Sequence, residues 1–251
     1  ERWFHYVCAS FPDPAQLPAE WKIDKQKYIC KDCQRRGVSL EGATRLLALQ
    51  YRRASSLRSH PLSDAIEGYI AQTMKARGVT VNGLVVRVVS SKRFSYPAFR
   101  SMKARYGTDY PDDFPYDSRA LLAFQEVEGR DVCFFAMYVQ EYGPTCPAPN
   151  TNRAYISYLD SVRYFLSEPD NHRSTMYHAI LVAYLQWTRM LGFKYVHIWV
   201  EPPKMGDEYI YFARSDQQRK PMKREKLREW YKRMLDKAKE KGIVESYGSM
   251  Q

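Results

Sequence analysis

The chain has 251 residues and carries 39 Lys and Arg against 28 Asp and Glu, a formal net charge of +11. Hydrophobic residues make up 45%, which excludes a disordered chain, and no apolar run reaches membrane-spanning length, so a soluble protein is expected. The basic excess favours anionic partners without choosing among nucleic acid, phosphorylated cofactors and acidic surfaces. Five cysteines in uneven positions do not suggest a secreted disulfide framework, and an intracellular setting is expected.

Residues 1–40 contain two pairs of potential metal ligands. His5 and Cys8 come first, and Cys30 and Cys33 follow. Each pair has the short spacing that lets two side chains share one tetrahedral zinc ion. The four could hold a single ion, or each pair could serve a different ion, as in cross-braced fingers. A chance cluster of buried thiols is the remaining alternative.

Two helical stretches are predicted next, at 42–60 and 61–78, with Ser63 as the N-cap of the second and Gly78 as its stop. Strand-like apolar runs follow at 84–90, 120–127, 131–142 and 154–160. The second and third of these runs are joined by only three residues, which predicts a β-hairpin.

Helix and strand patterns alternate in the second half. A helix is predicted at about 174–191, with an apolar stripe at positions 176, 177, 180, 181, 184, 185 and 188. Strands are predicted next at 195–200 and 209–213 on either side of a turn, with Trp199 near the end of the first strand. A closing helix has apolar residues at 227, 230, 231, 234 and 235, the spacing of one helix face. The order predicts an α/β fold with a central mixed β-sheet flanked by helices.

Charge is distributed unevenly along the chain. Residues 214–241 hold twelve Lys and Arg against five Asp and Glu, whereas 109–117 are acidic and rich in proline and aromatic residues. Arg173, Ser174 and Thr175 stand at the expected start of a helix, where free backbone N–H groups and a guanidinium suit a phosphate. Ordinary N-capping is the simpler explanation of the same residues. No glycine-rich P-loop or Rossmann loop is present.

Six segments occur in one order between about residues 85 and 244: DVCFFAMYVQEYGPTCPAPN, AYISYLDSV, HRSTMYH, GFKYVHIWVEPP, GDEYIYF and LREWYKRMLDKA. Together they resemble the catalytic domain of the CREB-binding-protein family of histone lysine acetyltransferases. Residues 1–40 resemble the end of the plant-homeodomain finger that precedes this domain, where His5 and Cys8 would complete one zinc site and Cys30 and Cys33 another. Residues 41–251 would be the catalytic domain, incomplete at its C-terminus, in a chain cut from a longer protein.

The resemblance implies transfer of acetyl from acetyl-CoA to lysine ε-amines of histone tails and other chromatin proteins, in a nuclear transcriptional co-activator recruited by transcription factors. It implies no membrane partner, and direct nucleic-acid binding is not expected because no recognised motif accompanies the net charge. The alternative is a non-catalytic chromatin-binding scaffold with a degenerate acetyltransferase fold.

The resemblance also implies site residues. Tyr231 would be the general acid, with Trp199 beside it, and its hydroxyl is expected to point to the same cavity as Asp160, Arg173 and Trp199. The acetyl-CoA site would be lined by Leu159, Asp160, Ser161, Arg173, Ser174, Lys220, Lys226 and Trp230. Two positions depart from the family pattern, because Glu201 stands where a Cys is common and Ala179 where a Glu is common, and both departures bear on substrate preference.

Overall fold

The computed structural model describes residues 35, 53–127, 129–204 and 222–249. The chain divides into two compact units, Glu1–Arg53 and Ala54–Gln251. The domain boundary predicted at residue 40 falls within the first unit and stays a prediction. Every helix and strand with described bounds belongs to the second unit. The predicted zinc ligands (His5, Cys8, Cys30 and Cys33), the predicted strand 209–213 and Lys220 lie outside the described residues.

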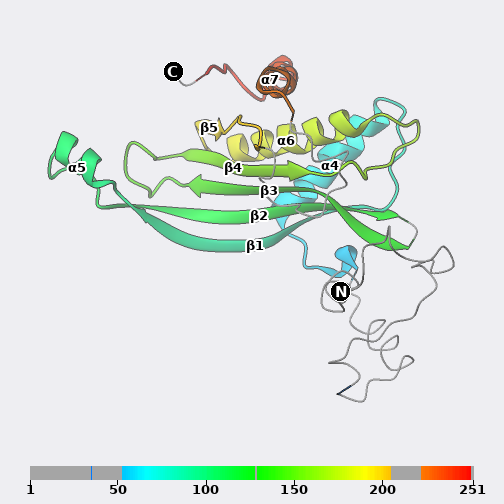
Figure 1. Ribbon diagram of the computed structural model, residues 1–251, viewed down its shortest axis with the longest axis horizontal. Coiled ribbons are helices and arrows are strands. Elements are labelled where there is room, and N and C mark those ends of the chain that lie inside the picture. Colours follow the sequence, from blue (N-terminus) through cyan, green and yellow to red (C-terminus); the bar gives the residue numbers. More distant parts are fainter. Residues whose placement is uncertain (1–34, 36–52, 128, 205–221, 250–251) are drawn as a thin grey trace, which may run out of the picture. The chain divides into compact units, whose positions relative to one another are not determined.

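A five-stranded sheet forms the centre of the second unit, with strand order β1-β2-β3-β4-β5 (Figure 1). Its strands are Leu84–Pro97 (β1), Asp113–Val127 (β2), Arg130–Tyr142 (β3), Arg153–Ser161 (β4) and Tyr195–Ile198 (β5). Neighbours from β1 to β4 pair antiparallel, and β4 pairs with β5 parallel. Because β2 and β3 meet with Val127 opposite Arg130, the predicted hairpin is confirmed. The sheet is therefore mixed, as predicted.

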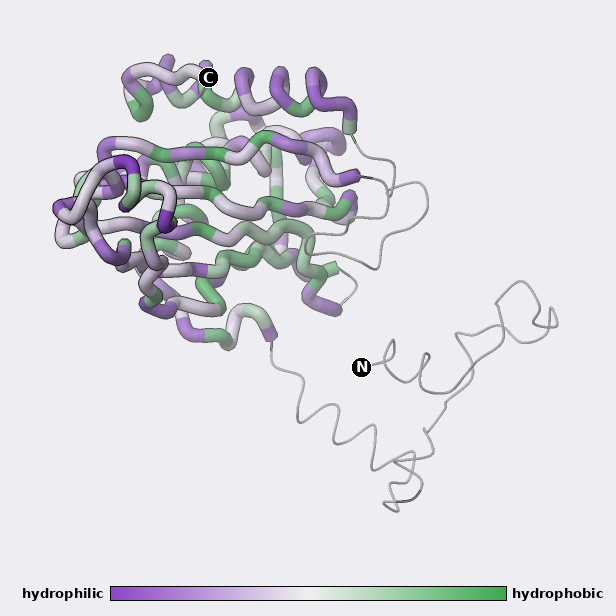
Figure 2. Tube along the Cα trace, turned by 60° about the vertical axis from the view of Figure 1, so that its left-hand side comes forward, coloured by the Kyte–Doolittle hydropathy of each residue, from purple (hydrophilic) through white to green (hydrophobic). Residues whose placement is uncertain are grey.

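The helices are Ala54–Ser56 (η3, a 3-10 turn), Pro61–Lys75 (α4), Arg100–Tyr106 (α5), Arg173–Met190 (α6) and Arg224–Glu240 (α7). α4 and α6 pack side by side, and α7 packs on α6 (Figure 1). α7 mixes mostly hydrophilic positions with a few hydrophobic ones (Figure 2), as expected of a helix that buries one face. Among the described residues, no helix is both long and apolar enough to cross a bilayer.

The crossover helix α6 is buried on almost every side. All seven positions of its predicted apolar stripe are buried, and His178, Ala179, Val182 and Ala183 are buried as well. The additional burial arises because the helix has α4 on one side and α7 on another. A helix so enclosed holds its N-terminal residues in a fixed place relative to the sheet.

The predicted N-cap of α4 is wrong. His60 is the cap, and its Nδ1 accepts a hydrogen bond from the Leu62 N–H at 3.1 Å. Ser63 lies fully buried inside the first turn, and its hydroxyl accepts the Val88 N–H at 3.0 Å. The Val86 N–H in turn donates to Glu67 Oε1 at 2.6 Å. Side chains of α4 thus satisfy backbone donors of β1, an outer strand of the described sheet.

The first two strands are longer than predicted. β1 continues to Pro97 and β2 begins at Asp113, so that the two form a long hairpin arm with α5 at its tip (Figure 1). Phe94 pairs opposite Tyr116, with ring centroids 5.9 Å apart, and Tyr116 contacts Tyr142 at 5.1 Å. Such cross-strand aromatic pairs stabilise strands that lack an apolar run.

The prediction that the helix at 42–60 continues to residue 60 is wrong. In the described part of that stretch, residues 53–60, only 54–56 are helical.

Candidate active site

The parallel strands β4 and β5 end at the same edge of the sheet. Ile156 lies opposite Ile198, and Leu159, Asp160 and Ser161 complete β4, while Trp199 follows β5 directly. In α/β sheets, ligands bind outside the carboxyl ends of parallel strands, next to the N-termini of the crossover helices. Four of the predicted site residues therefore lie where this topology places a ligand.

The N-terminus of α6 belongs to the same region. The helix begins at Arg173, and its cap residue, His172, makes no side-chain capping bond. The N-capping alternative for Ser174 is thus not observed. The first-turn N–H groups of this 18-residue helix therefore receive no acceptor from the side chain of their cap residue, and their partial positive charge favours an anion there.

Trp230 of α7 connects the two helices at this point. Its indole Nε1–H donates to Ser174 Oγ at 3.2 Å. Its ring packs on the His178 imidazole with centroids 4.4 Å apart, and meets the Tyr231 ring edge-on at 5.0 Å. The structure therefore brings together four side chains from positions far apart in the sequence.

Tyr231 is 6% exposed and lies within the hydrophobic core. Burial raises its pKa above the ordinary value of 10, so the phenol holds its proton throughout the neutral range. The ring is fixed on one side by Trp230 and at the base by its helix. The prediction that the hydroxyl shares a cavity with Asp160, Arg173 and Trp199 stays a prediction, because neither of the two cavities described below is lined by Tyr231.

Other predicted residues are more open. Trp199 is 65% exposed, and Lys226 is exposed on the first turns of α7. Leu159 is half-buried against the core, and the Asp160 carboxylate accepts the Ser161 N–H at 2.9 Å. These residues offer surface for a ligand without an enclosed cavity among the described side chains.

The sequence-based prediction missed His178. The imidazole is 5% exposed and lies between Trp230 and Lys237, with its Nδ1 3.2 Å from the Lys237 Nζ. Burial, followed by the positive charge of Lys237, lowers its pKa to about 4. Its position four residues after Ser174 puts both on one helix face, which is the one signal in the sequence that could have indicated it.

A second unexpected contact joins the segment after β5 to α7. Arg224 at the start of α7 donates through Nε to Glu201 Oε2 at 2.9 Å, and its Nη2 donates to the same oxygen. Glu201 is the residue that departs from the family pattern after Trp199. Its carboxylate is engaged in an ion pair, so it serves to hold α7 against the segment that follows β5.

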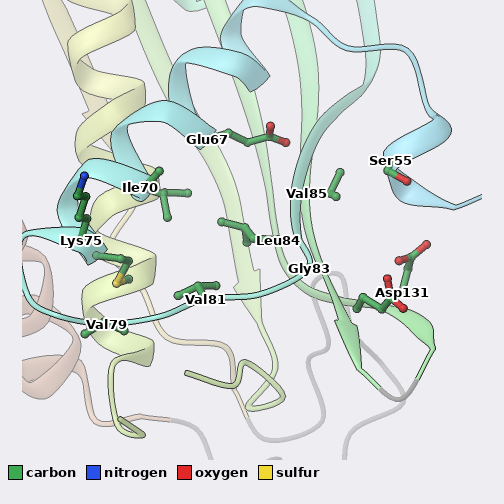
Figure 3. A pocket seen from close by; sticks show the side chains of 13 residues that line it. Ser55, Glu67, Ile70, Lys75, Val79, Val81, Gly83, Leu84, Val85 and Asp131 are labelled. Atoms are coloured by element: carbon green, nitrogen blue, oxygen red, sulfur yellow. The ribbon is translucent and has the colours of Figure 1, made fainter. Parts of the chain in front are cut away.

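A cavity of about 510 Å³ lies elsewhere, between α4 and the beginning of β1 (Figure 3). Apolar side chains such as Ile70, Val81 and Leu84 line part of it, with the carboxylates of Glu67 and Asp131 nearby (Figure 3). Glu67 is bonded to Arg87 and to the Val86 N–H. None of the predicted site residues lines this cavity, and its carboxylates have structural partners.

Comparison with known proteins agrees with this geometry. Residues 70–251 match the family "Histone acetyltransferase domain KAT3". The chain is 34% identical to Protein cbp-1 of Caenorhabditis elegans over 97% of its length and 12% of that relative. It is 36% identical to Histone acetyltransferase HAC12 of Arabidopsis thaliana, covering 97% of the chain and 15% of the relative. For Probable histone acetyltransferase HAC-like 3 of Oryza sativa subsp. japonica, the values are 38%, 96% and 20%.

The chain thus spans between about an eighth and a fifth of the length of these relatives. The family match covers both helices and both parallel strands that form the candidate site. The chain belongs to the KAT3 family of histone acetyltransferase domains.

Proposed function

We propose that the second unit is the part of the protein that transfers acetyl from acetyl-CoA to lysine ε-amines of histones and other chromatin proteins. The observation that carries the proposal is the hydrogen bond from Trp230 to Ser174. It holds the aromatic face of α7 beside the uncapped N-terminus of α6, at the carboxyl ends of β4 and β5.

Acetyl-CoA carries its negative charge on phosphate groups, and the candidate site offers complementary charge. The first-turn N–H groups of α6 and the Arg173 guanidinium would contact phosphate oxygens. Lys226 and Lys220 would add positive charge from the basic region. Leu159, Asp160 and Ser161 at the end of β4 would line the other side, and the half-buried Trp230 would pack against the pantetheine arm or adenine.

The chemistry requires a proton for the departing thiolate. The conjugate thiol has a pKa of roughly 8.5. A buried tyrosine, whose pKa is raised by desolvation, holds its proton at neutral pH and so is available as an acid. Tyr231 would fill this role, with Trp199 covering the reacting centre.

The attacking lysine must lose its proton. For a pKa near 10.4, neutralisation at pH 7 costs about 4–5 kcal/mol. The nearest acid in sequence to Trp199, Glu201, is bound to Arg224. Transfer of the amine from water and alignment with the thioester would therefore supply most of the rate enhancement.

The acidic segment 109–117 is a less direct contributor to substrate choice than its charge suggests. Asp160 lies level with Leu122 across the sheet, and Asp113 is nine residues further along β2, a separation of roughly 30 Å. Asp112 pairs with Lys103, and Asp113 accepts a hydrogen bond from Ser95. A histone tail would have to extend along the hairpin arm to reach these carboxylates.

The proposed function also includes recruitment of the protein by transcription factors and its localisation in the nucleus.

Acetyl-CoA binding measured by titration calorimetry is the direct test. We expect saturable binding by the chain, and at least about tenfold weaker binding by Trp230→Ala, which removes the indole between the two helices. Because Trp230 is half-buried, the same variant should lose about 2–3 kcal/mol of stability in urea unfolding. Trp230→Phe should recover most of the stability, but less of the affinity, since it cannot bond Ser174.

Leu191→Ala provides a control for nonspecific loss of apolar surface, because Leu191 is 52% exposed beyond the end of α6. Absence of acetyl-CoA binding by a folded chain would favour the non-catalytic scaffold and would contradict the proposal that the second unit is an acetyltransferase. Equal affinity in Trp230→Ala would remove Trp230 from the site while leaving the family assignment unchanged.

Zinc binding by residues 1–40 is also proposed, from the spacing of His5, Cys8, Cys30 and Cys33 alone. In the described part of the chain no group of three or more His, Cys, Asp or Glu could hold a metal. We expect metal analysis of the protein to find zinc, and to find less of it in Cys30→Ser. An unchanged zinc content in Cys30→Ser would exclude Cys30 as a ligand.

A further inference from the structure

A second cavity, of about 150 Å³, lies where α4, α6 and α7 meet. α4 contributes Thr73 to its wall, and Arg77 follows just after this helix. α6 contributes Thr175 and His178, and α7 contributes Lys237. Its volume is well above the roughly 10–15 Å³ that one water molecule needs by this measure. Ala179 and Val182 give part of the wall an apolar surface, and hydroxyl groups and cations stand around it.

Positive charge in this cavity is not balanced. Arg77, Lys237 and Lys241 line it, and Glu240 is its single carboxylate. Within the described part of the chain, none of the three cations has a carboxylate at ion-pair distance. Lys241 instead donates to the Tyr69 hydroxyl at 2.9 Å. Three cations gathered around one hollow repel one another unless an anion lies between them.

The buried imidazole provides a second and independent observation. Lys237 has only donor hydrogens when charged, so the His178 Nδ1 that it contacts at 3.2 Å must accept. The proton of the neutral ring is then on the buried Nε2. The Trp230 backbone lies close enough to raise the pKa of the ring, but no described atom meets hydrogen-bond geometry with Nε2. A buried donor without an acceptor is costly and is typical of a site that a ligand or ion completes.

We propose that this cavity is a binding site for a phosphate-bearing anion, separate from the acetyl-CoA site. Arg77, Lys237 and Lys241 would supply the charge, and the hydroxyls of Thr73 and Thr175 would supply neutral donors. Guanidinium, ammonium and hydroxyl groups together are the donors that bind phosphate oxygens in proteins. The site lies one side chain from Trp230, because His178 contacts both Lys237 and Trp230.

The direction of one pKa agrees with the proposal. Burial lowers the pKa of Lys237, and Arg77, Arg233 and Lys241 lower it further, against an opposing effect of Glu240. A bound anion would reverse this trend by giving the cations a common counter-charge.

Titration of the 251-residue chain with inorganic pyrophosphate, at constant ionic strength and with coenzyme A present at saturation to occupy the acetyl-CoA site, tests the proposal. We expect one saturable site, and at least about tenfold weaker binding in Lys237→Met, which keeps the aliphatic stem and removes the charge. Ala179→Glu should have the same effect by another route, because Ala179 lines the cavity and a carboxylate there would pair with its cations. Thermal unfolding checks that each variant is folded. If Ala179→Glu does not fold, Lys237→Met alone decides the question.

Two matched charge removals serve as controls. Lys239→Met changes an exposed lysine of the same helix outside the cavity, and Lys226→Met changes one assigned to the acetyl-CoA site. Both should bind pyrophosphate within about twofold of the unmodified chain. Binding that is lost in Lys226→Met and kept in Lys237→Met would place the anion in the acetyl-CoA site. That outcome, equal weakening in Lys239→Met, or no saturable binding would each overturn the proposal.

Discussion

Tyr231→Phe should reduce turnover by roughly 10²–10⁴-fold in a form of the protein that acetylates histones, because this is the usual contribution of a positioned general acid. The ring would stay in place, since Trp230 contacts it edge-on at 5.0 Å and the substitution removes only the hydroxyl. Acetyl-CoA affinity and thermal stability should therefore change little. Steady-state kinetics together with calorimetry separate the chemical step from binding.

Tyr184→Phe is the matched control. Tyr184 is fully buried in α6, and its hydroxyl donates to Glu141 Oε1 at 3.2 Å, so its loss should cost about 1 kcal/mol of stability without a large loss of turnover. The raised pKa of Tyr231 adds a pH test, because loss of its proton should not reduce the rate until pH is above 10. Unchanged turnover in Tyr231→Phe would make Tyr231 a packing residue of the core.

Much of the fold could be predicted because the signal lies in local apolar patterns. α6 buries every position of its predicted stripe, and α7 buries Tyr231, Met234 and Ala238 while half-burying its other apolar residues. The β2–β3 hairpin also followed from two apolar runs and a short connection. In each case one element's own sequence fixes which face meets the core.

The errors occurred where long-range contacts decide. Ser63 has the residue type of a cap, but its hydroxyl accepts from Val88, 25 residues away, and the imidazole of His60 caps the helix instead. The hairpin arm was missed because its strands are stabilised by pairs such as Phe94 with Tyr116 rather than by a buried face. Propensity and periodicity carry no information about such partners.

The candidate site shows the same division. The residue types at Arg173 and Ser174 indicated an anion site, and the resemblance supplied Trp230 and Tyr231. The hydrogen bond between Trp230 and Ser174 spans 56 residues, and only the structure connects them. His178 was missed because its four-residue spacing from Ser174 is a weak signal within an apolar helix, whereas its contacts with Trp230 and Lys237 are visible only in the structure.

Arg119→Met should destabilise the second unit by about 3–5 kcal/mol, because it would leave the Glu141 carboxylate buried without its cation. The Glu141 side chain is 3% exposed, and Arg119 Nε donates to its Oε2 at 2.8 Å. Arg119 Nη1 also donates to Ser91 Oγ at 2.8 Å, so that one guanidinium joins three strands.

Urea unfolding of a double-mutant cycle measures this effect without relying on either single variant. Arg119→Met combined with Glu141→Met removes both charges from the β2–β3 pair, and should be clearly more stable than Arg119→Met alone, because no uncompensated carboxylate remains. The Tyr184 hydroxyl would lose its acceptor in the double variant, which limits the recovery by about 1 kcal/mol. Strictly additive losses would show that the carboxylate is not desolvated as the structure indicates, and that Arg119 contributes mainly through its bond to Ser91.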